Sequence, residues 1–123
     1  MKLVLFWLYL ANALVLTIHE IDSAYWHEWK LFYLPGGESG FLLMHIPLLV
    51  PLIYGLVLVD RGVLSGLILS LILCGAGIFA FSIHTYLIRH GHPEFKTPVS
   101  QGILWVTMLL SQAQLGVTLV LLV

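Results

Sequence analysis

Four long apolar segments, separated by short polar or turn-rich stretches, dominate the pattern along this chain. The separating stretches hold the usual helix breakers: Pro-Gly-Gly after Leu34, Asp-Arg-Gly from Asp60, and a polar loop between Arg89 and Pro98. A helix needs about 20 mainly apolar residues to cross the hydrocarbon core of a bilayer. We therefore predict four membrane-spanning helices, at about residues 3–23, 40–59, 63–88 and 99–123.

The composition agrees with this pattern. Of the 123 residues, 60% are hydrophobic and only 9% are charged, and a soluble domain of this length leaves too much surface exposed to accommodate that content. We predict an all-α integral membrane four-helix bundle that forms one domain, residues 1–123, with the lipid bilayer as its surroundings. An even number of spans places both termini on the same side. The net charge of −1 argues against a nucleic-acid partner, which would need a basic patch.

The membrane face opposite the termini carries most of the ionisable side chains. All six histidines fall on it, together with five of the six acidic residues. Lysine and arginine are nearly balanced between the faces, with two on the side of the termini and three on the other, so their distribution leaves the orientation open.

Four of these ionisable residues lie within the apolar segments, near the ends that meet at this face. His19 and Glu20 come near the end of the first segment, His45 near the start of the second and His84 near the end of the third. An ionisable group inside a span is costly, by roughly 2.5–3.5 kcal/mol on insertion scales, and is expected to pair or to bind something. Three imidazoles and one carboxylate suit zinc or non-haem iron. The leading hypothesis is a mononuclear divalent-metal site, structural or hydrolytic.

Further polar residues are candidates for supporting or alternative ligands of such a metal. Asp22, Ser23 and His27 follow the cluster along the first helix, and Gln114 lies on a polar stripe of the last helix. Glu28, by contrast, is predicted to be a charge of the loop that follows the first span. The pattern assigns no catalytic residue, and it leaves open whether His27 has such a supporting role.

The same residues leave other hypotheses open. They could form a metal-free hydrogen-bonded network, or a polar pocket for a lipid-like ligand in which Glu20 or Asp22 and a histidine perform acid/base chemistry. Two histidines on facing helices, such as His45 and His84, could ligate haem b. The short loops are also compatible with a homo-oligomer or a small accessory subunit of a larger membrane complex.

The block from His19 to Leu49, HEIDSAYWHEWKLFYLPGGESGFLLMHIPLL, resembles a family of small, uncharacterised bacterial four-span membrane proteins that carries a domain-of-unknown-function label. The resemblance extends along most of the chain. It implies the four-span topology and a bacterial inner-membrane location, and it implies no activity and no catalytic residue.

Overall fold

The computed structural model describes all 123 residues, and its regular elements are all helices. They are α1 (Lys2–Tyr25), α2 (Glu28–Leu31), α3 (Gly37–Arg61), α4 (Leu64–Arg89) and α5 (Pro98–Leu122). The four long helices are apolar and long enough to cross a membrane, which confirms the predicted four-span helical architecture. Their ends lie within three residues of the predicted boundaries. The short helix α2 was not predicted.

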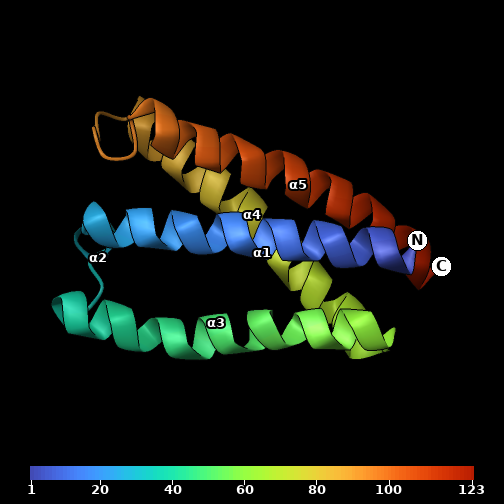
Figure 1. Ribbon diagram of the computed structural model, residues 1–123. Coiled ribbons are helices and arrows are strands. Elements are labelled where there is room, and N and C mark those ends of the chain that lie inside the picture. Colours follow the sequence, from blue (N-terminus) through green and yellow to red (C-terminus); the bar gives the residue numbers. More distant parts are fainter.

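Both termini lie at one end of the bundle, as predicted (Figure 1). The opposite end, which we call the loop end, carries α2 and the connection of residues 90–97 between α4 and α5. The ionisable residues singled out from the sequence lie near this loop end, whereas Gln114, the uncharged candidate, lies further along α5.

The long helices pack so that α1 contacts α3 and α5, while α4 also contacts α3 and α5. Gly62 has a φ of 69° and ends α3 in the left-handed region, which glycine adopts without strain, so that α4 follows at once. From this turn α3 and α4 separate toward the loop end (Figure 1). Helix α2 connects α1 to α3 there, and contacts both.

A polar seam runs through the middle of the bundle between α1, α4 and α5. Asn12 donates to Ser111 Oγ at 2.9 Å and to Gln114 Oε1 at 3.0 Å, and it accepts from Thr107 Oγ1 at 2.8 Å. Gln114 Nε2 donates to Ser70 Oγ at 2.8 Å. Polar groups in hydrocarbon must find partners within the protein, and here they join three helices. The central seam comprises six buried residues: Asn12, Ser70, Thr107, Ser111, Gln114 and Thr118.

The close approach of α4 to α5 along this seam depends on Gly77. A Cβ atom at this position would collide with the side chains of Ser111 and Thr107. Small residues allow helix backbones in membranes to approach closely enough for hydrogen bonds across the interface. Gly77 therefore makes room for the polar contacts that the seam residues form.

Candidate functional site

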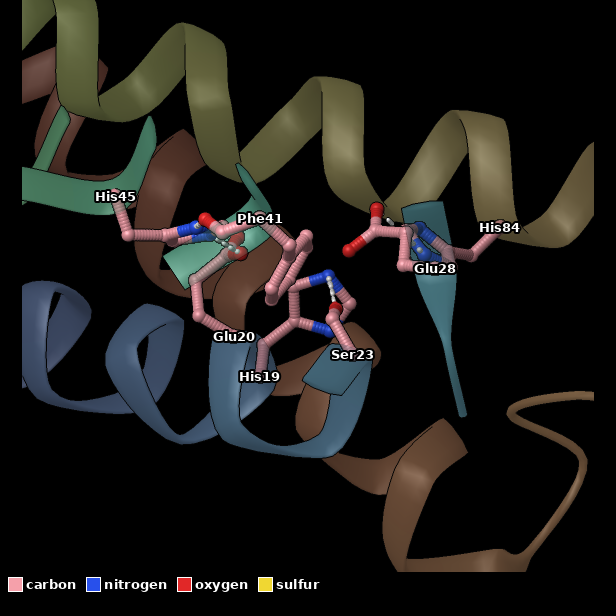
Figure 2. Close-up of polar contacts among 7 residues, drawn as sticks. All are labelled: His19, Glu20, Ser23, Glu28, Phe41, His45 and His84. Atoms are coloured by element: carbon pink, nitrogen blue, oxygen red, sulfur yellow. Dashed lines mark hydrogen bonds and ion pairs between the residues drawn. The ribbon is translucent and has the colours of Figure 1, made fainter. Parts of the chain in front are cut away.

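The loop end brings ionisable side chains together as separate pairs, the first of which is Glu20 with His45. His45 Nε2 lies 2.5 Å from Glu20 Oε2, and His45 Nδ1 lies 2.6 Å from the carbonyl oxygen of Phe41 (Figure 2). A carbonyl can only accept, so Nδ1 carries a proton and Nε2 is the atom left to face the carboxylate. The close Nε2–Oε2 contact then requires a proton between the two groups, and the pair holds one exchangeable proton.

The second pair is His84 with Glu28. His84 Nε2 lies 3.5 Å from Glu28 Oε1, an ion-pair distance without hydrogen-bond geometry, and His84 Nδ1 donates to the carbonyl oxygen of Ala80 at 2.7 Å. The two side chains are only 2% and 13% exposed. The arrangement repeats that of His45, because each histidine is anchored by the carbonyl four residues earlier in its own helix and directs Nε2 at a glutamate.

His19 lies between these pairs (Figure 2) and is 1% exposed. Its ring meets the ring of His84 edge-on, with centroids 4.7 Å apart, and its Nε2 is 3.5 Å from Ser23 Oγ. Phe95, from the connection between α4 and α5, packs against both imidazoles. Its ring centroid lies 5.7 Å from that of His19 and 4.2 Å from that of His84. His19 Nδ1 and His84 Nε2 are buried without a hydrogen-bond partner. Such orphaned groups are costly in a protein interior.

The four residues predicted as metal ligands are thus present at the same end of the bundle but are divided between different contacts. Glu20 and His45 bind each other, whereas His19 and His84 form a separate imidazole pair beside Glu28. No group of three or more His, Cys, Asp or Glu side chains is arranged as it would be around a metal ion. The metal site and the haem alternative stay predictions.

The predicted supporting residues have other contacts. Asp22 accepts a hydrogen bond from Trp26 Nε1 at 3.0 Å, and Ser23 alone among them lies beside His19. His27 follows the end of α1 with a φ of 55°, in the left-handed region, and its exposed ring lies 5.0 Å from that of Trp29. Because of this left-handed backbone, His27 forms the chain reversal between α1 and α2. Gln114 belongs to the central seam, where its side chain bonds to Asn12 and Ser70.

The interpretation of Glu28 as a loop charge is wrong. The reversal at His27 places Glu28 at the start of α2, and the glutamate faces His84 from there. Phe95 was also missed, although it is 1% exposed and seals the imidazole pair. The local sequence around either residue holds no signal for these contacts, because the partners lie far apart along the chain.

The surroundings of Glu28 set its charge. Burial by itself raises the pKa of the Glu28 carboxyl, but the neighbouring side chains of His84 and Ser23 and the charge of His19 outweigh burial, so that the pKa falls below its ordinary value. Glu28 is therefore a carboxylate at neutral pH. An ion pair with this carboxylate requires a proton on His84 Nε2.

A cavity of about 300 Å³ adjoins both pairs. Glu20, Glu28 and His45 form part of its wall, and the remaining lining is largely apolar. Three lining side chains on α3 and α4 are exposed on the outside of the bundle: Met44, Leu48 and Phe79. The cavity lies where α3 and α4 have separated, and it opens sideways, toward the surface that faces lipid.

Comparisons with known proteins identify the family of the chain and give no activity for it. No curated protein and no solved structure matches the chain. A family model described as a family of unknown function, DUF6713, matches residues 5–121, nearly the whole length. The four-span helical chain, with its paired histidines and glutamates at the loop end, therefore belongs to the DUF6713 family.

Proposed function

We propose that the protein binds a neutral lipid-like molecule in the cavity at the loop end, and that the Glu20–His45 pair exchanges a proton with the polar head of that molecule. The observation that carries the proposal is the composition of the cavity wall. Two carboxylates and one imidazole line the cavity. Apolar side chains form much of the rest of the lining, and some of them are exposed on the lipid-facing surface. Ligand pockets combine an apolar lining with a few placed polar groups in this way.

The charges around the cavity favour a neutral head group. Glu20 and Glu28 each face a histidine, so a cationic ligand would compete with an imidazole already in place. An anionic head would approach two carboxylates in a medium of low dielectric constant, where like charges repel strongly. A head with hydroxyl or carbonyl groups can instead hydrogen-bond to the pairs without adding charge.

The Glu20–His45 pair is the better placed of the two for proton exchange. Its contact holds one proton between Nε2 and Oε2, and both residues line the cavity. A hydroxyl or carbonyl oxygen bound there can accept this proton from the pair, and a hydroxyl can also pass its own proton to the carboxylate. His84 is further from the cavity wall, since Glu28 lines the cavity and His84 does not.

Photolabelling tests the binding proposal. A photoreactive monoacylglycerol should label the peptide that contains Met44 and Leu48 in a saturable manner, and unlabelled monoacylglycerol should compete. Leu48→Trp fills the cavity and should lower saturable labelling about tenfold. Glu20→Gln and His45→Gln, which keep side-chain size, should also weaken it. Equal labelling by a photoreactive fatty acid would contradict the preference for a neutral head.

Leu43→Trp is the matched control for Leu48→Trp. It makes the same change on α3 at a side chain that is 66% exposed and does not line the cavity. Saturable labelling should be unchanged in this variant. Equal losses in both variants, or labelling that never saturates and spreads over all outer faces, would mean that the probe reports only contact with bulk lipid.

A second candidate is the divalent-metal site, because two buried imidazole nitrogens, His19 Nδ1 and His84 Nε2, have no hydrogen-bond partner. Glu28 is the nearest carboxylate to His84 and would complete a set of two histidines and one carboxylate after side-chain movement. Protein purified without chelators should then hold about one equivalent of zinc or iron. His19→Gln and His84→Gln should lose it and His27→Gln should keep it. Less than about a tenth of an equivalent would overturn this candidate.

We also propose a bacterial inner membrane as the location of the protein. The support is the resemblance of the block from His19 to Leu49 to small bacterial four-span proteins, together with the four helices that are apolar and long enough to cross a membrane. Fractionation of bacterial cells that express the chain with an epitope tag should recover it with the inner membrane. Recovery with the outer membrane would contradict the proposal.

A further inference from the structure

A second and larger cavity, of about 610 Å³, lies at the loop end among the turn after α1, α2, the start of α3 and the connection between α4 and α5. It shares no lining residue with the cavity described above. Aromatic rings and carboxylates line it, and no lysine or arginine does. The residues that matter for its chemistry are Tyr25, Trp26, His27, Trp29, Glu38 and Glu94.

The two indole rings of this cavity are held in place by contacts with neighbouring side chains. Trp26 Nε1 donates to Asp22 Oδ1 at 3.0 Å, and the Trp26 ring meets Tyr25 edge-on with centroids 4.9 Å apart. The Trp29 ring lies 5.4 Å from Phe41. Because these contacts fix the rings before any ligand binds, a ligand would meet aromatic surfaces that need little reordering.

The carboxylates of the cavity lack a strong cationic partner. Glu94 Oε2 is buried and has no hydrogen-bond partner, and the imidazole atom His92 Nδ1 lies 4.0 Å from it. Glu38 is exposed and forms no ion pair. Asp22 does not line the cavity, but its Oδ2 atom, on the carboxylate that accepts from Trp26 Nε1, is also buried without a partner. A buried carboxylate oxygen without a donor is unfavourable, and a cation in the cavity would relieve that cost.

Aromatic faces with carboxylates, and with no lysine or arginine to compete, are the combination that recognises an ammonium group, because the negative face of each ring attracts a cation. We infer that this cavity binds an organic ammonium group, either of a small molecule or of a lipid head group. The volume of the cavity, about 610 Å³, and its aromatic ring surfaces suit an alkylated cation better than a metal ion, and its carboxylates are not arranged as metal ligands.

Tryptophan fluorescence of the full chain in an uncharged detergent tests this inference. Choline and ethanolamine are titrated beside 3,3-dimethylbutan-1-ol, the neutral carbon analogue of choline. A saturable change with the cations and none with the neutral analogue is expected. Trp29→Leu and Glu94→Gln should each weaken choline binding by about tenfold, the equivalent of 1.4 kcal/mol. A response to the neutral analogue equal to that for choline would overturn the inference.

Two controls separate this cavity from the rest of the molecule. Trp105→Leu removes an exposed indole on α5 that lies outside the cavity, and Glu20→Gln removes a carboxylate of the other cavity. Both should bind choline as the unaltered chain does. Glu94→Gln should keep the unfolding temperature of the unaltered chain, so that its loss of binding reports the missing charge. Unchanged choline binding in Glu94→Gln and Trp29→Leu would overturn the inference.

Reconstitution then distinguishes the two sources of the ammonium group. In nanodiscs of phosphatidylglycerol, which offers no ammonium group, choline should bind as in detergent. If nanodiscs of phosphatidylcholine abolish the response to free choline, the lipid head group occupies the cavity. If choline binds equally in both, the ligand is a free small molecule, and the ammonium chemistry holds in either case. No binding of choline or ethanolamine in detergent or in phosphatidylglycerol would overturn it.

Discussion

Two polar regions lie inside this apolar bundle, and they differ in whether their buried side-chain atoms all have hydrogen-bond partners. In the central seam, hydroxyl and amide groups are fully buried and every buried side-chain atom has a hydrogen-bond partner. At the loop end, the polar groups are titratable, and His19 Nδ1 and His84 Nε2 have no partner. A cavity adjoins the loop-end pairs and opens toward lipid.

Under the proposed function, this difference separates a structural role of the seam from a binding role of the loop end. A satisfied network of neutral groups joins helices and offers nothing to a ligand, because each donor already has its acceptor. Histidines and carboxylates next to an open cavity keep capacity to bind or to exchange protons, and they are maintained at a cost to stability. Substitutions in the seam should therefore change stability most, and substitutions at the loop end should change binding most.

The largest expected loss of stability comes from Gly77→Ala. The added Cβ collides with the side chains of Ser111 and Thr107, so α4 and α5 must move apart and hydrogen bonds of the seam must stretch. Overpacking of this kind costs about 1–3 kcal/mol. Unfolding in mixed micelles by a denaturing detergent measures the change in free energy. Gly75→Ala is the matched control on the same helix, since a Cβ there meets nothing within 4 Å; a comparable loss in that variant would refute the packing explanation.

A smaller loss is expected from Gln114→Leu. The leucine keeps the volume but removes the hydrogen bonds to Asn12 and Ser70, and it leaves one amide hydrogen of Asn12 unpaired. Hydrogen bonds between membrane helices contribute about 0.6 kcal/mol each on average. The same unfolding assay should show a loss of about 1.2 kcal/mol for the bonds to the two residues, with labelling by the monoacylglycerol unchanged. Gln101→Leu, at an exposed position of α5, should have little effect on either measurement.

The smallest expected effect on stability is the pH dependence that Glu28 confers. The pKa of Glu28 is lower in the folded protein than its ordinary value, so the ionised form stabilises the fold. This contribution is complete above the pKa of the unfolded chain and is lost as the pH falls through the folded-state pKa. Thermal unfolding between neutral pH and about pH 3 should show a decline in stability to which this group contributes, and Glu28→Gln should make the decline shallower. A steeper decline in the variant would contradict the assigned direction.

The spans could be predicted from the sequence because the bilayer imposes a local requirement. Each segment must supply about 20 apolar residues in a row, and turns such as Asp60 to Gly62 interrupt the pattern visibly. The common side of His19, Glu20, His45 and His84 follows from counting spans. The pairing within that set does not, because it depends on how far α3 separates from α4 and on which face of each helix turns inward.

Glu28 and Phe95 show most clearly what the tertiary structure decided. Both lie in short connections with no hydrophobic periodicity, and both backbones depend on a left-handed residue, His27 before Glu28 and Phe95 itself with a φ of 68°. A single such dihedral redirects the chain, and its direction depends on the packing that follows it. The sequence determined that four apolar helices span a membrane and which end carries the ionisable groups, because hydrophobicity acts residue by residue. Only the packed bundle decided which histidine faces which glutamate, because those contacts join residues that are neighbours in space and distant along the chain.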